Sequence, residues 1–184
     1  MNFKEPAKGR LLISEPFLPD PNFQRSVILL CDHNEEGSFG LVLNKKMGVR
    51  MENVMPELDL DVPVFQGGPV ELNTLHFLHT IPDLIDNSQQ VTENIFWGGN
   101  FEKLKFLAST KQLNHDNIRF FIGYSGWGSG QLNAELSQKT WFITNGEINN
   151  FFLEDDEKYW RTVLKDMGGK FKVMSNFPDD PSLN

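Results

Sequence analysis

The sequence predicts an α+β fold, with a mixed, largely antiparallel sheet in a single domain. Strand-like runs dominate the first half of the 184 residues, and amphipathic helical runs gather in the second half. The predicted strands are joined by hairpin-type turns as well as by helices, whereas a doubly wound sheet alternates strand and helix throughout. A chain of this length forms one typical domain and buries about 70% of its unfolded surface on folding. A sizeable hydrophobic core is therefore expected without disulfides.

Five short runs in the first half have the composition of strands: residues 9–14, 26–32, 39–43, 62–65 and 74–79. The run at 26–32 (SVILLCD) is apolar on both faces, which is typical of a central strand covered on each side. The turn residues at 35–38 (EEGS) lead into the next run, so these two strands are expected to form a hairpin. Between the first two strands, the three prolines of residues 15–25 prevent regular ladder pairing and predict an ordered loop.

Helical patterns begin after residue 100. Asn100 is a suitable N-cap for a helix. An apolar stripe at helical spacing follows it, formed by Phe101, Leu104, Leu107 and Ala108. A strand at 118–124 then runs into the glycine-rich residues 123–130, and a short helix carrying Leu132 and Leu136 is expected after them.

The C-terminal part contains one more predicted strand and the last predicted helix. Residues 141–144 (WFIT) predict a strand that ends at an Asn145-Gly146 turn signal. Acidic residues at 154–157 begin the helix and Gly168 ends it. Its apolar face consists of Trp160, Val163, Leu164 and Met167. After Phe171 the chain becomes polar and proline-rich, so we expect a frayed end, and we assign residues 1–174 to the domain and 175–184 to a polar C-terminal tail.

The formal net charge of −8 is unevenly distributed. Residues 51–101 carry eight acids and no Lys or Arg, whereas the rest of the chain carries as many bases as acids. An unrelieved negative field repels phosphate backbones, which argues against direct nucleic-acid binding. A solvated acidic rim and a binding face for a basic partner both fit this pattern.

Features of membrane and secreted proteins are not visible in the sequence. The longest unbroken apolar run spans residues 27–31, whereas a membrane span needs about 20 residues. Residues 1–6 contain no apolar segment of a secretory signal. The single cysteine, Cys31, cannot form an internal disulfide, which fits a reducing compartment. We therefore expect a cytoplasmic protein without a membrane partner.

The glycine-rich segment at 123–132 (GYSGWGSGQL) approaches three known motifs but completes none of them. A P-loop needs Lys and then Ser or Thr where Gln131 and Leu132 stand, and the dinucleotide fingerprint needs a third glycine at Gln131. The nucleophile elbow fails because Trp127 occupies the position of its second glycine. We interpret the segment as a tight turn in which Trp127 fills the core, with anion binding at the helix start as the alternative.

Clusters typical of metal or nucleophilic sites are weakly represented. His76 and His79 fall on a predicted strand, which would turn their side chains apart, and neither CxxC nor HExxH occurs. No metal site and no cofactor are therefore expected. Cys31 and His33 would point to the same face of a continuing strand, but a catalytic pair would need the strand to bend. Cys31 also lies in an apolar run, as inert thiols do, and His33 is expected to cap the following turn.

The proline-fixed residues 20–26 (DPNFQRS) form the most unusual segment. They place several hydrogen-bonding groups beside a buried strand: Asp20, Asn22, Arg25 and Ser26. Asp20 can cap its own turn, and Arg25 can pair with it or with a carboxylate elsewhere, so the segment can be purely structural. The alternative is a recognition loop that its prolines hold rigid.

Three stretches resemble the signature segments of the bacterial YqgE/AlgH family. Residues 9–45 (GRLLISEPFLPDPNFQRSVILLCDHNEEGSFGLVLNK) are similar to its opening segment. Residues 67–70 (GGPV) and 123–136 (GYSGWGSGQLNAEL) are similar to its other two segments, in the same order. Asn133 departs from the pattern, since the family usually has an acidic residue there, and any role of that carboxylate is in doubt here. Lys46 also departs, where a proline is common, and this touches only a turn.

The resemblance implies an α+β fold with a strongly curved, barrel-like sheet flanked by helices. It brings no established catalytic residues, and members of the family are often labelled transcriptional regulators. The acidic middle segment and the lack of a visible helix-turn-helix signature fit such a label only if regulation is indirect.

We therefore expect a non-enzymatic interaction or regulatory domain with a protein or small-molecule partner. One alternative is a hydrolase that uses His33 with Asp20 or Cys31. The other is a DNA-binding regulator, which rests on the family label alone.

Our hypothesis for the site is a shared recognition groove. The loop at 20–26 and the turn at 123–131 carry more polar and glycine residues than a core needs, and they would approach one another beside His33. In this groove Arg25 would bind an anionic or carbonyl group, Gln131 would hydrogen-bond it, and Trp127 would form an apolar wall.

Overall fold

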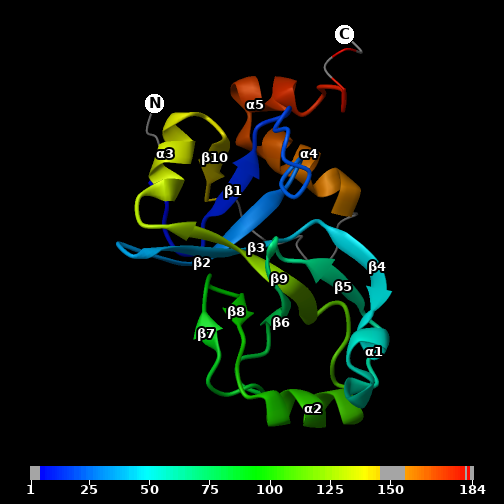
Figure 1. Cartoon of the computed structure of the whole chain (residues 1–184). Coiled ribbons are helices and arrows are strands. Elements are labelled where there is room, and N and C mark those ends of the chain that lie inside the picture. The colour runs from blue at the N-terminus through cyan, green and yellow to red at the C-terminus, as the bar shows by residue number, and fades with distance from the viewer. Residues whose placement is uncertain (1–4, 146–155, 181, 183–184) are drawn as a thin grey trace.

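The computed structural model describes residues 5–145, 156–180 and 182. Its strands form one 10-stranded sheet with helices around it (Figure 1). The strands are β1 (Leu11–Ser14), β2 (Val27–Asn34), β3 (Gly37–Val42), β4 (Lys46–Arg50), β5 (Pro63–Gln66), β6 (Val70–His79), β7 (Gln89–Gln90), β8 (Phe96–Trp97), β9 (Ile118–Gly128) and β10 (Trp141–Thr144). The helices are α1 (Met51–Val54), the 3-10 helix η1 (Pro56–Leu58), α2 (Phe101–Ser109), α3 (Gln131–Ser137), α4 (Asp156–Met167) and α5 (Gly169–Met174). The predicted α+β class is confirmed.

The long strand β9 is shared by the two halves of the sheet. The main strand order is β10-β1-β2-β3-β9-β6-β8-β7, and β4 pairs with β5, which joins β9. The C-terminal part of β9 pairs with β3, and its N-terminal part pairs with β5 and β6. The β5–β9 pairing is parallel and the other pairings between described strands are antiparallel, as predicted for a mixed, largely antiparallel sheet. The sheet stays open, with β10 and β7 at the ends of this order.

Strand β2 is the central strand that the sequence predicts. Each residue from 27 to 31 is at most 1% exposed, because both faces of β2 are covered. Leu29 packs in the core that includes Trp160 of α4, and Ile28 packs in the core that includes Trp127 and Leu132. Figure 1 shows the corresponding layers, with α4 and α5 on one side of the β1–β2 half and α3 on the other.

A third core lies at the other half of the sheet, against α2. Leu104, Leu107 and Ala108 of α2 are buried there, as their spacing predicts. The Asn100 side chain caps the helix, since its Oδ1 accepts hydrogen bonds from the backbone N–H groups of Glu102 and Lys103 at 3.0 and 3.3 Å. The cap and the stripe together explain why residues 101–109 form a helix.

The two glycines of the GGPV segment (residues 67–70) are needed because the backbone there packs closely against β9. A Cβ atom at Gly67 would lie 2.3 Å from the carbonyl oxygen of Gly123, and one at Gly68 would lie 2.1 Å from that of Tyr124. Gly68 also has a φ of +157°. Gly123, which lies in β9 opposite this segment, has a φ of +67°. Side chains at these positions would push the two segments apart, so this motif has a folding role.

Several features differ from the sequence-based expectations. The glycine-rich segment is mostly strand, because β9 continues to Gly128 and only Ser129 and Gly130 form the turn. Trp127 fills the core, as expected. The elements β4, β7, β8 and α1 were not predicted from the sequence. Of these, β7, β8 and α1 carry too few residues to show a period, and β4 is almost wholly exposed and so has no apolar face.

The C-terminal end is more ordered than the sequence predicts. Gly168 ends α4 with a φ of +70°, as expected, but a further helix, α5, follows it. Ser175 is fully buried, and the backbone carbonyls of Ser175, Phe177 and Pro178 accept hydrogen bonds from Arg25 and Arg161. The expected turn at Asn145-Gly146 and the acidic start of the last helix fall largely outside the described residues.

Candidate functional site

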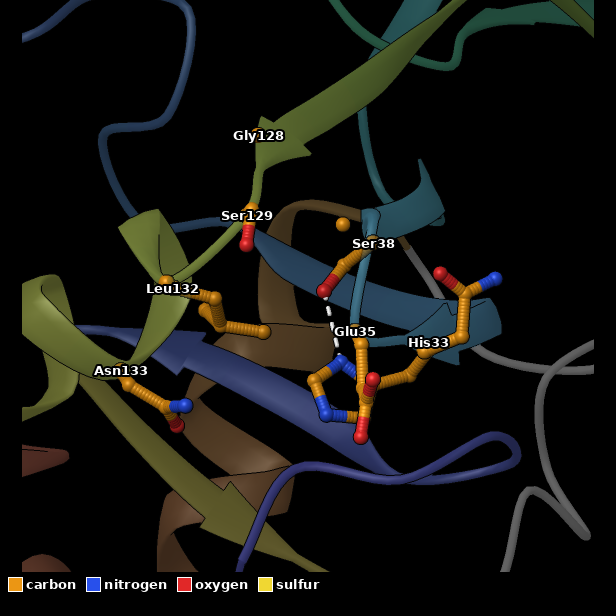
Figure 2. A pocket seen from close by; sticks show the side chains of 10 residues that line it. His33, Glu35, Ser38, Gly128, Ser129, Leu132 and Asn133 are labelled. Carbon is orange, nitrogen blue, oxygen red and sulfur yellow. Dashed lines mark hydrogen bonds between the residues drawn. The ribbon is translucent and has the colours of Figure 1, made fainter.

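An open pocket of about 480 Å³ lies where the β2–β3 hairpin meets the turn from β9 to α3 (Figure 2). Its lining comes from both segments and consists of His33, Asn34, Glu35, Gly37, Ser38, Gly128, Ser129, Gly130, Leu132 and Asn133. A volume of this size falls within the range of small-molecule and side-chain binding sites. We take this pocket as the candidate site.

Strand pairing places the pocket residues on one face of the sheet. His33 faces Ser38 across the β2–β3 hairpin, and Ser38 faces Trp127 across β3 and β9. Directly opposed residues on paired strands project to the same face, so these three side chains share it. The Nδ1 atom of His33 and the Oγ atom of Ser38 lie 2.7 Å apart and form a hydrogen bond (Figure 2).

The turn between β9 and α3 is held by side-chain hydrogen bonds. The backbone N–H of Gly128 donates to Oε1 of Gln131 at 3.0 Å, and Nε2 of Gln131 donates to Oε1 of Glu135 at 3.0 Å. Gly130 adopts a φ of +73°, which the turn requires. Gln131 does not line the pocket, and its amide is used to fix the turn.

Glu135 is a structural group near the site that the sequence analysis missed. Its Oε2 atom accepts hydrogen bonds from Nε1 of Trp127 at 2.9 Å and from Nε1 of Trp141 at 2.7 Å. Trp127 packs in a core cluster and is not one of the residues that line the pocket, so its role as an apolar wall stays a prediction. A signal was available in the sequence, because buried indole N–H groups need acceptors and Glu135 stands four residues after Gln131 on the same helix.

The loop at 20–26 uses its polar groups to build itself. Oδ1 of Asp20 accepts a hydrogen bond from the backbone N–H of Asn22 at 2.9 Å, which closes an Asx turn. The Ser26 hydroxyl donates to the carbonyl of Phe23 at 2.7 Å, and the Ser26 N–H donates to Oγ of Ser14 at 3.0 Å. The loop reaches the core beneath α3 through Phe23, whose ring contacts Trp141.

Arg25 does not join His33, Trp127 and Gln131 in a groove. Its guanidinium group lies 4.7 Å from the ring centroid of Trp160, which belongs to the core on the opposite face of the sheet. Its Nη2 donates to the carbonyls of Phe177 and Pro178, and its Nη1 pairs with Asp179 at 2.9 Å. The physical reason is position, since Arg25 precedes β2 whereas His33 stands near the end of this eight-residue strand.

Cys31 and His33 point to opposite faces of the sheet, contrary to our expectation. The β2–β3 register shifts between Leu30 and Asp32, so Cys31 is the extra residue of a bulge. Its thiol is buried with Leu29 in the core beneath α4. Burial raises the pKa of the Cys31 thiol far above its ordinary value. Neither Cys31 nor Asp20 hydrogen-bonds to His33, and both find other partners among the described residues.

We predict that the Cys31 thiol of the native protein reacts with a thiol reagent roughly a hundredfold or more slowly than in the unfolded chain, because both access and ionisation are suppressed. Ellman's reagent at pH 8, with and without denaturant, measures the two rates. The chain has one cysteine, so the signal has a single source. Rapid stoichiometric labelling of the native protein would contradict this prediction.

The other two histidines of interest have structural partners. His79 is fully buried, with Nε2 facing the carbonyl of Gly98 at 3.0 Å and Nδ1 accepting from the backbone N–H of Ile81 at 3.3 Å. His76 contacts Thr74 and the ring of Phe39. Burial lowers the pKa of both imidazoles. Within the described residues, no three His, Cys, Asp or Glu side chains come together as metal ligands would.

The AlgH-like family model matches residues 11–172 of this chain. The chain belongs to the YqgE/AlgH family. Curated relatives match this chain over nearly its whole length. A UPF0301 protein of Cytophaga hutchinsonii is 44% identical over 179 residues, covering 96% of this chain and 98% of the relative. A UPF0301 protein of Bacteroides thetaiotaomicron is 38% identical over 182 residues, covering 97% and 92% of the two chains.

Solved structures share the fold of this YqgE/AlgH chain. A crystal structure of a Corynebacterium diphtheriae protein matches with a TM-score of 0.80 at 24% identity, covering 96% of this chain and 95% of that one. The solution structure of AlgH from Pseudomonas aeruginosa matches with a TM-score of 0.72 at 24% identity, covering 97% and 98%. No helix within the described part of the chain combines the length and apolar character that crossing a membrane demands.

Proposed function

We propose that this YqgE/AlgH protein is a non-enzymatic interaction domain in the cytoplasm, and that its pocket between the β2–β3 hairpin and α3 binds a partner protein. The observation that carries the proposal is the composition of the pocket. Its walls present the Glu35 carboxylate, the Ser129 hydroxyl and the Asn133 amide, and these three side-chain groups form no hydrogen bond or ion pair within residues 5–145, 156–180 and 182. These polar groups are not used to hold the fold and remain open to solvent, so the surface is suited to recognition.

The position of the family's signature segments supports the same proposal. The first segment ends in the β2–β3 hairpin, and the third contains the turn from β9 to α3, so both contribute to the pocket. The second segment, GGPV, is explained by close packing of Gly67 and Gly68 against β9. Packing therefore accounts for one segment, whereas two segments meet at an open surface.

Binding is preferred to hydrolysis because the groups that a His33-based hydrolase would need lie elsewhere. The thiol of Cys31 is buried on the opposite face, and Asp20 closes an Asx turn in another loop. Any effect on transcription would then be indirect, since six of the eight acids in residues 51–101 form no ion pair within the described part of the chain and leave that region strongly negative.

The test compares two tryptophan substitutions at neighbouring positions of α3. Asn133 lines the pocket, whereas Ala134 is exposed and does not line it. Wild-type protein, Asn133→Trp and Ala134→Trp are immobilised and incubated with lysate of the native host, and captured proteins are quantified by mass spectrometry. A protein that wild type and Ala134→Trp retain should be lost by about tenfold or more in Asn133→Trp, because the indole fills the pocket.

Circular dichroism spectra of the three proteins show whether both variants keep the fold. If Asn133→Trp retains the same proteins as wild type, the pocket is not the binding site. If the three proteins capture nothing above a blank support, the interaction function itself is wrong.

A further inference from the structure

The pocket contains one carboxylate and no Lys or Arg. Among its ten lining residues, Glu35 is the one Asp or Glu, and His33 is the other side chain that can titrate. The hairpin around it is also acidic, since the sequence between Arg25 and Lys45 contains Asp32, Glu35 and Glu36 but no Lys or Arg. Fields of one sign in a concave site raise the local concentration of oppositely charged groups. The electrostatics therefore favour a cationic ligand.

The hydrogen-bonding groups left available in the pocket suit a donor. The Asn34 amide is used within the hairpin, because its Oδ1 accepts from the N–H of Glu36 at 2.8 Å and its Nδ2 donates to Asp32 at 3.4 Å. The Glu35 carboxylate accepts only, and the Ser129 hydroxyl and Asn133 amide oxygen accept as well. Figure 2 shows Glu35 on the hairpin side of the pocket, with Ser129 and Asn133 on the α3 side.

We propose that this pocket binds the guanidinium group of an arginine side chain in the partner protein. A guanidinium has five N–H donors in a planar fork and no acceptor, and it pairs with a carboxylate through two parallel hydrogen bonds. Glu35 would supply that carboxylate, and Leu132, which is 2% exposed, would give the aliphatic stem an apolar contact. This inference rests on the proposed function, because it names the chemistry of the partner at the same site.

The experiment uses two capped tripeptides that differ in one side-chain group. Gly-Arg-Gly and Gly-citrulline-Gly have nearly the same shape, but citrulline replaces the guanidinium by a neutral urea, which removes the charge and puts a carbonyl acceptor in place of N–H donors. Each is titrated into the ¹⁵N-labelled full chain and followed by two-dimensional NMR. The arginine peptide should shift the amide signals of His33, Ser129 and Asn133, and the citrulline peptide should bind about three- to tenfold more weakly.

A matched pair of variants tests the role of Glu35. Glu35→Gln and Glu36→Gln each remove one negative charge from adjacent, exposed positions of the same turn, but only Glu35 lines the pocket. The arginine peptide should bind Glu35→Gln about three- to tenfold more weakly than wild type, whereas Glu36→Gln should change its affinity by less than about twofold. Equal losses in the two variants would indicate diffuse attraction and would overturn the proposal.

The outcomes separate this inference from the proposed function. Absence of shifts at the pocket with the arginine peptide overturns the arginine proposal, even where Asn133→Trp abolishes partner capture and the interaction function stands. Shifts at the pocket that depend on Glu35 and on the guanidinium support recognition of an arginine side chain there, and if Asn133→Trp then leaves partner capture unchanged, the proposed function fails and that arginine does not belong to the captured protein.

Discussion

Replacing Glu135 with alanine is expected to lower the free energy of unfolding by about 3 kcal/mol, because two buried indole N–H groups lose their shared acceptor. Trp127 is 6% exposed and Trp141 is 3% exposed, so water cannot freely replace the carboxylate. The hydrogen bond from Gln131 to Oε1 of Glu135 is lost as well. Urea denaturation followed by tryptophan fluorescence and circular dichroism measures the change.

Two further substitutions assign this cost to the indole hydrogen bonds. Glu135→Gln keeps one carbonyl acceptor and should cost about 1 kcal/mol. Glu102→Ala removes a carboxylate from α2 whose side chain is 79% exposed and pairs with Lys105, and it should cost less than about 0.5 kcal/mol. A loss below about 1 kcal/mol for Glu135→Ala would show that the indoles find other partners.

Elements with a strong local pattern of apolar and capping residues could be predicted from the sequence. The two-sided apolar run of β2 and the capped, striped helix α2 carry enough residues to show their pattern. The strand β9 shows what local signals miss. Its glycines indicate a turn, yet the strand continues to Gly128 because β3 pairs with it from Ser125 to Gly128. That contact joins residues far apart in sequence, so it has no local signature.

Of the segments that the sequence analysis assigned to the site, His33 and the turn at 128–130 line the pocket, and the loop at 20–26 does not. His33 and the turn before α3 do meet, because β3 pairs with both β2 and β9. The bulge at Cys31, which reverses the face of that side chain, has no clear signal in an apolar run. Arg25 was assigned to the groove because it lies in an unusual loop, and sequence alone does not reveal that Trp160, 135 positions later, receives it.

Arg25 joins three parts of the chain on the face opposite the pocket. Its guanidinium stacks on Trp160 of α4, whose Nε1 donates to the carbonyl of Ser14 at the end of β1. Its Nη2 donates to the carbonyls of Phe177 and Pro178 at 3.0 and 2.5 Å, which holds the segment after α5. The side chain is only 15% exposed, whereas the paired Asp179 is 78% exposed. Burial lowers the pKa of Arg25, and the Asp179 carboxylate opposes that shift, so the group stays charged at neutral pH.

Arg25→Ala should therefore lower the free energy of unfolding by about 3 kcal/mol, because it removes two charge-assisted hydrogen bonds and a cation–π contact from a shielded site. Urea denaturation measures the loss, and limited proteolysis should cleave the released residues after 175 faster than in wild type. Arg25→Lys keeps the charge without the planar fork, and its free energy of unfolding should lie between those of wild type and Arg25→Ala.

Arg50→Ala is the control, since Arg50 also pairs with an aspartate, Asp61, but is 44% exposed and should cost less than about 1 kcal/mol. If Arg25→Ala costs no more than Arg50→Ala, Arg25 does not anchor the C-terminal segment, and a recognition role for this loop returns.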